Sequence, residues 1–220
     1  MGKPRSAKGR AALVGERLAE QYPGTAKDLC ELDHQNPFQL LAATILSAQT
    51  TDVRVNMVTP VLFAKYPTPA ALASANSDEL EETVRSTGFY RNKAKSLVGM
   101  ARALEERFDG QVPSSIEDLV TVPGTGRKTA NVVRSVAMNQ PGLPVDTHVL
   151  RLSRRLGLVD PELANDPVKV EHVLNALVPA GERGVFSLRV ILHGRRVCDA
   201  RKPKCGECSL GDFCPSAGKC

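Results

Sequence analysis

The sequence predicts an all-α protein. Apolar residues recur at helical spacing in several segments of the 220-residue chain, proline and glycine separate these segments, and no stretch shows the two-residue alternation of a half-buried strand. Hydrophobic residues make up 42% of the chain, which is enough for a sizeable core. Because tryptophan is absent and other aromatic residues are scarce, Leu, Val, Ile and Ala must supply most of that core.

The first strong helical segment is PFQLLAATILSAQ, residues 37–49, which is apolar on both faces and is therefore expected to be buried, with Gln49 at the end of its stripe. SDELEETVRSTG, residues 77–88, begins with Ser77 as an N-cap and ends at Gly88. RNKAKSLVGMARALEERF, residues 91–108, carries one apolar stripe. Shorter helices are expected over residues 114–122, 127–138, 146–158 and 167–178.

The net charge of +5 is a mild excess of base, which favours a polyanionic partner. The basic amino-terminal stretch is not followed by the apolar run of a secretory signal. No apolar stretch reaches the ~18 residues that a membrane span requires. We therefore expect a cytoplasmic protein with no membrane partner.

The segment LVTVPGTGRKTANVV, residues 119–133, places a glycine-rich turn before Lys128. A P-loop is disfavoured because Arg127 separates Gly126 from the lysine and because a helix, rather than a strand, is expected before the turn. A helix-hairpin-helix remains, in which Gly124 and Gly126 permit backbone conformations closed to other residues and free N–H groups offer a seat for one phosphate. The alternatives are a tight turn between packed helices and an ordinary solvated lysine.

Asp146 lies just before the next predicted helix, where its simplest role is that of an N-cap. A helix from Arg127 to Met138 rises ~18 Å at ~1.5 Å per residue. The return segment NQPGLPV can span up to ~23 Å at ~3.3 Å per residue. The chain can therefore bring the Asp146 carboxylate back level with Lys128, which would pair an amine with a carboxylate beside a phosphate-binding hairpin.

Four of the six cysteines crowd together with the spacing C-x6-C-x2-C-x5-C, at Cys198, Cys205, Cys208 and Cys214. Crowding of this kind indicates a metal centre, since a disulfide-stapled domain spreads its cysteines through a smaller chain. Four thiolates bind zinc as readily as an iron–sulfur cluster, so chemistry alone leaves both open. The remaining cysteines, Cys30 and Cys220, show no functional pattern.

Taken together, VPGTGRKTANVV, PVDTHVLR and the cysteine run resemble the endonuclease III family of DNA glycosylases with associated lyase activity. The resemblance extends from about PFQLLAATILSAQTTD to Cys214. It implies that Lys128 attacks the deoxyribose C1′ of a flipped, damaged pyrimidine nucleotide and that Asp146 assists departure of the base. The Schiff base then permits β-elimination on the 3′ side of the lesion. It also implies a structural [4Fe–4S] cluster held by the four crowded cysteines.

The same resemblance assigns DNA contacts. Gln49 matches the family's gap-filling glutamine, and Phe89 stands where the family usually has a leucine wedge. Gly124, Gly126 and Arg127 in the hairpin and His148 beside the aspartate are further candidates for DNA binding. The plainer alternatives are a satisfied polar residue for Gln49 and helix packing for His148. For Tyr90, Arg91 and Lys93, backbone contacts and a solvated basic turn stand as equal alternatives.

The resemblance further implies two helical lobes flanking an active-site cleft. One is a six-helix barrel over residues 30–140, with the helix-hairpin-helix at about 116–135. The other is an iron–sulfur cluster domain made of residues 1–29 and 141–220. We expect a monomer that binds double-stranded DNA containing damaged bases or abasic sites and associates with the bacterial nucleoid.

Two other functions are weighed against a bifunctional glycosylase and lyase for oxidised pyrimidines. A monofunctional mismatch or uracil-type glycosylase is one; the adenine-specific enzymes of this kind lack a lysine at the position of Lys128 and carry an additional C-terminal recognition domain, which we do not expect here. A non-catalytic, metal-stabilised DNA-binding module is the other. Such a module needs neither Lys128 nor Asp146.

Overall fold

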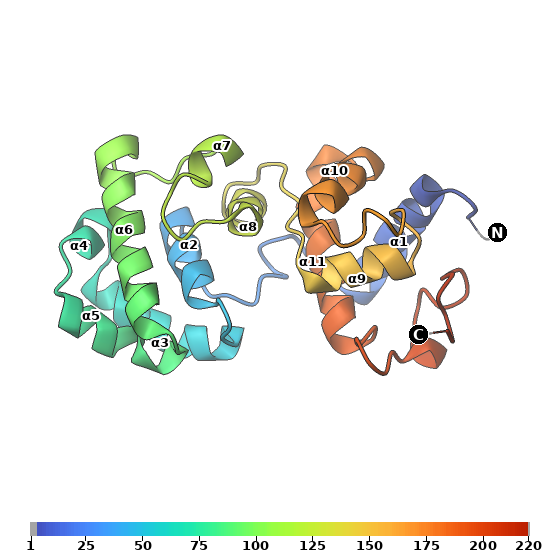
Figure 1. The fold of residues 1–220 in the computed structure, drawn as a ribbon, viewed down its shortest axis with the longest axis horizontal. Coiled ribbons are helices and arrows are strands. Elements are labelled where there is room, and N and C mark those ends of the chain that lie inside the picture. Colours follow the sequence, from blue (N-terminus) through green and yellow to red (C-terminus); the bar gives the residue numbers. More distant parts are fainter. Residues whose placement is uncertain (1–3, 220) are drawn as a thin grey trace. The chain divides into compact units, whose positions relative to one another are not determined.

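The computed structural model describes residues 4–219, and over that range it is helical with no β-strand, which confirms the predicted all-α class (Figure 1). The chain divides into two compact units. The central unit is Cys30–Gln140, and the terminal unit joins Met1–Leu29 to Pro141–Cys220. Cys220, for which the sequence suggests no role, lies outside the described residues.

The central unit is built around α2, which contacts α3, α6 and α8 and is buried along nearly its whole length. The helix starts sharply because Asn36 caps it, accepting a hydrogen bond from the Gln39 backbone N–H at 2.9 Å, and because Pro37 fits the first turn. The α-helices of this unit are α2 (Pro37–Leu46), α3 (Asp52–Lys65), α4 (Pro69–Ala73), α5 (Ser77–Val84), α6 (Tyr90–Phe108), α7 (Ile116–Leu119) and α8 (Arg127–Ala137), with a short 3₁₀ turn at Arg85–Thr87.

Two local expectations in this unit are wrong. Helix α2 ends at Leu46, so Gln49 lies in the following turn rather than on the helix. Asn76, not Ser77, caps α5, because the Asn76 side chain accepts from the backbone N–H groups of both Asp78 and Glu79. In both places the observed helix boundary lies within a few residues of the boundary that periodicity predicts.

The terminal unit packs α1 and α9 against α11, whose middle is almost fully buried. Its α-helices are α1 (Ala7–Gln21), α9 (Thr147–Arg155), α10 (Pro167–Leu177) and α11 (Arg183–Arg196), with 3₁₀ turns at Ala180–Glu182 and Cys205–Glu207. Arg17 on α1 forms an ion pair with Asp212 and donates to the Ser209 carbonyl at 2.6 Å. The first helix thus holds the polypeptide that follows the third crowded cysteine.

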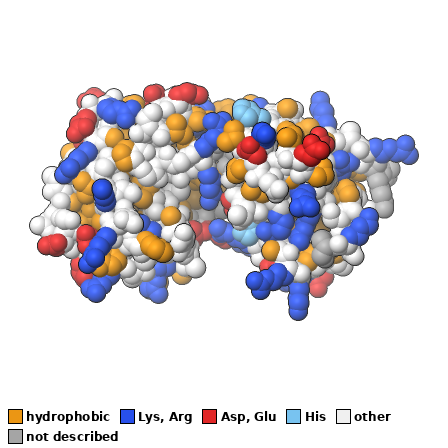
Figure 2. Space-filling model, in the orientation of Figure 1, with side chains coloured by type: hydrophobic (Ala, Val, Ile, Leu, Met, Phe, Trp, Pro, Cys, Tyr) orange, Lys and Arg blue, Asp and Glu red, His pale blue; other side chains and the backbone are white. Residues whose placement is uncertain are grey.

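No helix within residues 4–219 combines the length and the apolar character that a bilayer crossing requires. Lys and Arg side chains are visible on the surfaces of both units on the face in view (Figure 2).

Candidate functional site

The predicted hairpin connects α7 to α8. Ser115 caps α7 by accepting from the Asp118 backbone N–H at 3.0 Å, and the Thr125 N–H donates to the Val122 carbonyl at 3.0 Å to close the turn. Val122 and Leu119 are buried, so the hairpin is anchored in the apolar core of the central unit. This arrangement agrees with the helix-hairpin-helix that the sequence predicts.

The two glycines of the hairpin differ in what they require. Gly124 has a φ of +79°, and a Cβ there would approach the Ser96 Cβ to 3.1 Å and the Ile45 Cδ1 to 3.2 Å. Gly126 has an ordinary φ of −85°, and a Cβ there would meet nothing within 4 Å. The expectation that both glycines adopt unusual backbone conformations is therefore wrong for Gly126, which instead leaves open space at the start of α8.

Lys128 lies in the first turn of α8 and is exposed. The described residues give it no hydrogen bond or ion pair, so the amine is available to a reactant. Arg127 precedes Lys128 in sequence, and the positive end of the α8 dipole lies at the same turn.

Asp146 is the N-cap of α9, as its simplest role predicts. Its Oδ1 atom accepts from the backbone N–H groups of His148 at 2.8 Å and Val149 at 2.9 Å. Among the described residues, Oδ2 accepts no hydrogen bond. The capping bonds therefore orient the carboxylate and leave one oxygen for chemistry.

The segment that leads to Asp146 is itself fixed. Leu143 and Val145 are buried, and the fully buried Ser187 of α11 donates its hydroxyl to the Pro144 carbonyl. Because these contacts hold the backbone on both sides of Pro144, the position of Asp146 does not depend on its cap alone.

Gln49 and Phe89 occupy two turns of the central unit and share a pocket with Gly124 of the hairpin. Both residues have left-handed backbone conformations, with φ of 55° for Gln49 and 47° for Phe89. Both side chains are exposed, and Phe89 retains 67% of its accessible surface. A left-handed conformation at such residues persists only where surrounding contacts maintain it.

Lys93 departs from the solvated turn that the sequence offered as one alternative. It is only 5% exposed, and its ammonium donates to the Thr50 Oγ1 and to the Thr87 carbonyl, each at 2.7 Å. Lys93 falls on the same helical stripe as the buried Leu97, Met100 and Leu104 of α6. Lys93 continues the apolar stripe of α6 by one turn toward the start of the helix. This position is the sequence signal that could have predicted its burial.

His148 lies half-buried on α9. A Cβ added to Gly194 would approach the His148 Cβ to 2.9 Å, and the Arg151 Nη2 lies 3.0 Å from the His148 Nδ1. Burial lowers the pKa of the imidazole below its ordinary value, so the ring is neutral at neutral pH. These contacts give His148 a packing role within the terminal unit.

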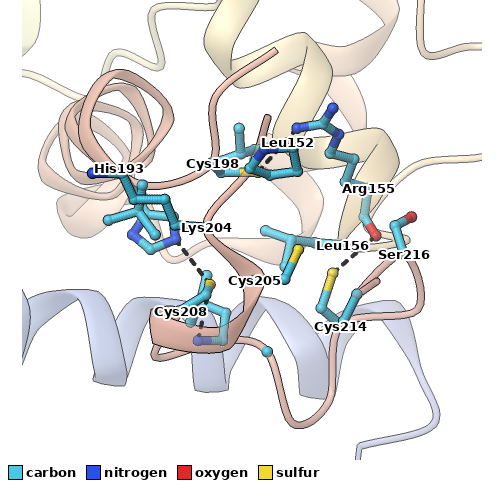
Figure 3. Close-up of a pocket in the computed structure, with 15 residues that line it drawn as sticks. Leu152, Arg155, Leu156, His193, Cys198, Lys204, Cys205, Cys208, Cys214 and Ser216 are labelled. Atoms are coloured by element: carbon cyan, nitrogen blue, oxygen red, sulfur yellow. Dashed lines mark hydrogen bonds between the residues drawn. The ribbon is translucent and has the colours of Figure 1, made fainter. Parts of the chain in front are cut away.

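The four crowded cysteines line one cavity at the end of the terminal unit (Figure 3). None of them forms a disulfide. Arg155 of α9 and His193 of α11 reach their edge: the Arg155 Nη1 donates to the Cys198 Sγ at 3.3 Å, and the His193 Nε2 lies 3.3 Å from the Cys208 Sγ. Leu152, Leu156 and Leu210 are among the other residues that line the cavity.

The polar groups around the cavity suit bound thiolates. The Leu210 backbone N–H donates to the Cys208 Sγ at 3.4 Å. Burial raises the pKa of the Cys208 thiol and lowers that of His193 to about 4, so the free thiol and the neutral imidazole are favoured when no metal is bound. Metal coordination deprotonates such a thiol outright, after which the nearby N–H donors stabilise the thiolate.

Within residues 4–219, no group of three or more His, Cys, Asp or Glu side chains is arranged to hold a single metal ion. The four cysteines nevertheless line one largely apolar cavity, and four thiols of this kind suit either a zinc ion or an iron–sulfur cluster.

The site residues are thus divided between the two units. Lys128, Gln49, Phe89 and the hairpin belong to the central unit, and Asp146, His148 and the cysteines belong to the terminal unit. The structure brings Gln49, Phe89 and Gly124 to one pocket and the four cysteines to another.

Comparisons with known proteins agree with these features. Residues 42–180 match the HhH-GPD superfamily base excision DNA repair protein family, and residues 198–214 match the iron–sulfur binding domain of endonuclease III. Endonuclease III of Synechocystis sp. is 52% identical over 98% of this chain and 96% of its own length. Endonuclease III of Bacillus subtilis is 41% identical over 93% of this chain and 91% of its own length.

Solved structures give the same result. One is a non-covalent complex of an endonuclease III with DNA, which superposes with a TM-score of 0.87 at 40% identity and covers 96% of each chain.

Proposed function

Because the chain belongs to the endonuclease III family, we propose that Lys128 is its nucleophile and that Asp146 assists departure of the base. The activity of the chain is that of a bifunctional DNA glycosylase and AP lyase in base excision repair of oxidised pyrimidines, and its cofactor is a [4Fe–4S] cluster. The observation that carries the proposal is the exposed amine of Lys128, which has no partner within residues 4–219 and directly follows a hairpin with open space at Gly126.

The proposed reaction begins at the sugar. The neutral Lys128 amine forms a bond to C1′ while the bond from C1′ to the damaged base breaks, and the base leaves with a proton. Opening of the sugar ring gives an imine between Lys128 and C1′. Loss of a C2′ proton then expels the 3′ phosphate, so the strand is cut on the 3′ side of the lesion.

Asp146 contributes a negative charge held in place by its cap. Its Oδ1 atom is engaged by two backbone N–H groups, while Oδ2 can stabilise the cationic sugar or take up the proton of the attacking amine. Asp146→Asn preserves the cap, because asparagine caps helices as well as aspartate does. The substitution therefore removes the charge without removing the structure.

The proposed DNA contacts divide by chemistry. Gly124, Gly126 and Arg127 hold one phosphate through the open start of α8, which grips a strand without reading its sequence. Gln49 and Phe89 enter the duplex when the damaged nucleotide is flipped, a step that costs a few kcal/mol and leaves a gap to be filled. The family resemblance supports a further DNA contact from the exposed part of His148, whose ring also packs within the terminal unit.

We also propose that Cys198, Cys205, Cys208 and Cys214 are the cluster ligands, in a terminal unit that serves as the iron–sulfur domain, while the central unit corresponds to the helical barrel. When bound, the cluster supplies a rigid scaffold for the loop between the first and last of these cysteines. We propose a monomer on double-stranded DNA with damaged bases or abasic sites, associated with the bacterial nucleoid. Light scattering with and without duplex tests the oligomeric state.

Borohydride reduction in the presence of abasic-site DNA tests the central proposal. The parent protein should give a covalent adduct that survives denaturing electrophoresis, and Lys128→Gln should give none while it still binds the duplex. Lys169→Gln is the matched control, because Lys169 is an exposed lysine on α10. An undiminished adduct in Lys128→Gln would overturn the assignment.

A duplex that carries an oxidised pyrimidine separates the other functions. Base release without strand scission by the parent would indicate a monofunctional glycosylase. Retention of the duplex with neither reaction would indicate a binding module. Asp146→Asn should slow base release much more than it weakens binding, and equal losses in both would remove Asp146 from the reaction.

A further inference from the structure

We propose that Lys93 is a positioning residue that fastens the turn carrying Gln49 to the turn carrying Phe89, so that both side chains meet DNA as one rigid element. The inference rests on the proposed entry of Gln49 and Phe89 into the duplex. It adds a residue that touches neither DNA nor the reacting atoms.

The two turns need an external support. Gln49 and Phe89 both have positive φ, a conformation that residues with a side chain rarely adopt and that persists only where surrounding contacts maintain it. Both side chains are exposed, so their own packing does not supply those contacts. The support must come from the backbone and side chains immediately beside them.

Lys93 provides that support through hydrogen bonds to both turns. Its Nζ atom donates at 2.7 Å to the Oγ1 of Thr50, the residue after Gln49, and at 2.7 Å to the carbonyl of Thr87, two residues before Phe89. The Thr50 hydroxyl also donates to the Thr87 carbonyl, and the Lys93 backbone N–H donates to the Phe89 carbonyl at 3.1 Å. One side chain thus joins segments that lie 43 and 6 residues away in sequence.

We call this network of Lys93, Thr50 and Thr87 the clamp. Each of its hydrogen bonds joins a group that can donate to a group that can accept. The ammonium only donates, the Thr50 hydroxyl accepts from it and donates onward, and the Thr87 carbonyl uses both of its lone pairs. The Thr87 hydroxyl turns away and donates to the Val84 carbonyl at 2.7 Å, which fixes that turn to the end of α5. The assembly is therefore a closed network rather than a set of independent contacts.

The buried charge argues against a purely structural role. Lys93 is 5% exposed, and its hydrogen-bond partners among the described residues are all uncharged oxygens. Burial lowers the pKa of its ammonium below the ordinary value, which shows that the site disfavours the charge. Since apolar residues of similar volume fill such positions without this penalty, Lys93→Met should fold well and still release the turns.

The experiment uses the full-length protein on a duplex in which a non-cleavable abasic analogue faces 2-aminopurine. Fluorescence of 2-aminopurine increases when the protein displaces that base from the stack. At saturating protein, the parent and Lys95→Met should give the full increase, because Lys95 is an exposed lysine two residues further along α6. Lys93→Met should lose at least half of the increase, with binding to undamaged duplex changed little.

A second substrate tests positioning against simple loss of structure. When the lesion lies in a bulge, no partner base has to be displaced. On this substrate Lys93→Met should regain most of the parent rate, whereas on the paired lesion its kcat should fall severalfold with little change in KM. Thr50→Val removes one acceptor of the clamp and should reproduce the fluorescence loss in part. This variant keeps the proposal testable if Lys93→Met does not fold.

The possible failures are distinguishable. If Gln49→Ala and Phe89→Ala leave the fluorescence increase intact, the proposed DNA contacts are wrong. If those two variants reduce it while Lys93→Met and Thr50→Val do not, the contacts stand and the clamp is refuted. Equal losses of Lys93→Met on the paired and bulged lesions would also refute the clamp.

Discussion

Alanine substitutions at Gly124 and Gly126 should differ sharply in their effect on folding, although both residues belong to the proposed phosphate-binding hairpin. Gly124→Ala places a Cβ on a residue with φ of +79° and pushes it against the Ser96 Cβ at 3.1 Å and the Ile45 Cδ1 at 3.2 Å. Gly126→Ala places a Cβ in open space on a residue with an ordinary φ of −85°. The two substitutions add the same atom two residues apart.

The loss of stability can be worked out for each. Left-handed backbone costs a residue with a Cβ about 1–2 kcal/mol, and displacement of the two crowding side chains adds about 1 kcal/mol. Gly124→Ala should therefore destabilise the protein by about 2–3 kcal/mol, which corresponds to a fall in Tm of about 4–12 °C for a chain of this length. Gly126→Ala changes only the N-cap of α8 and should cost about 1 kcal/mol or less.

The assay combines thermal unfolding, followed by far-UV circular dichroism, with fluorescence anisotropy of an abasic-site duplex at fixed salt. Gly126→Ala should bind the duplex severalfold more weakly, because the added methyl occupies the space proposed for a phosphate. Gly124→Ala should show the large fall in Tm, with binding measured below its transition.

Equal falls in Tm for the two variants would refute the distinction between the glycines. Unchanged DNA affinity in Gly126→Ala would refute the phosphate site while leaving the folding argument intact.

Three further predictions concern the terminal unit. Arg155→Met removes hydrogen bonds to the loop around the cluster and should speed iron loss to a chelator severalfold, measured by the fading of visible absorbance, while Arg154→Met on the exposed face of α9 should not. Ser187→Ala leaves a buried carbonyl without its donor and should lower the free energy of unfolding by about 1–3 kcal/mol in urea titrations. Arg17 holds the pKa of the Asp212 carboxyl below its usual range, so Arg17→Met should raise that pKa toward the ordinary value in a carbon NMR titration. The ionised Asp212 carboxyl stabilises the fold through this pair, and the effect is lost when the carboxyl is protonated. The difference in the free energy of unfolding between the parent and Arg17→Met should therefore shrink as the pH falls through the pKa of the paired carboxyl.

Much of the candidate site could be predicted from sequence because its signals are local. The spacing of the four cysteines, the glycine turn before Lys128 and the position of Asp146 ahead of a helix each depend on residues a few positions apart. The helix class follows from the same kind of signal, since caps, periodicity and turn residues act within one or two turns of the chain.

Tertiary structure decided the features that depend on segments far apart in the sequence. The ammonium of Lys93 gains its hydrogen-bond partners only when Thr50 and Thr87 are brought to it, and Gly124 needs to be glycine partly because Ile45 and Ser96 pack against it.

By itself the sequence therefore determined which groups are proposed for the chemistry of this protein: an amine, a carboxylate and four thiols, each marked by its immediate neighbours. The fold alone decided how Gln49 and Phe89 are held, because their left-handed turns are maintained by a buried ammonium that reaches across 43 residues of chain to one of them. Hydrogen bonds between distant segments form only after the helices have packed, so no local pattern could have announced them.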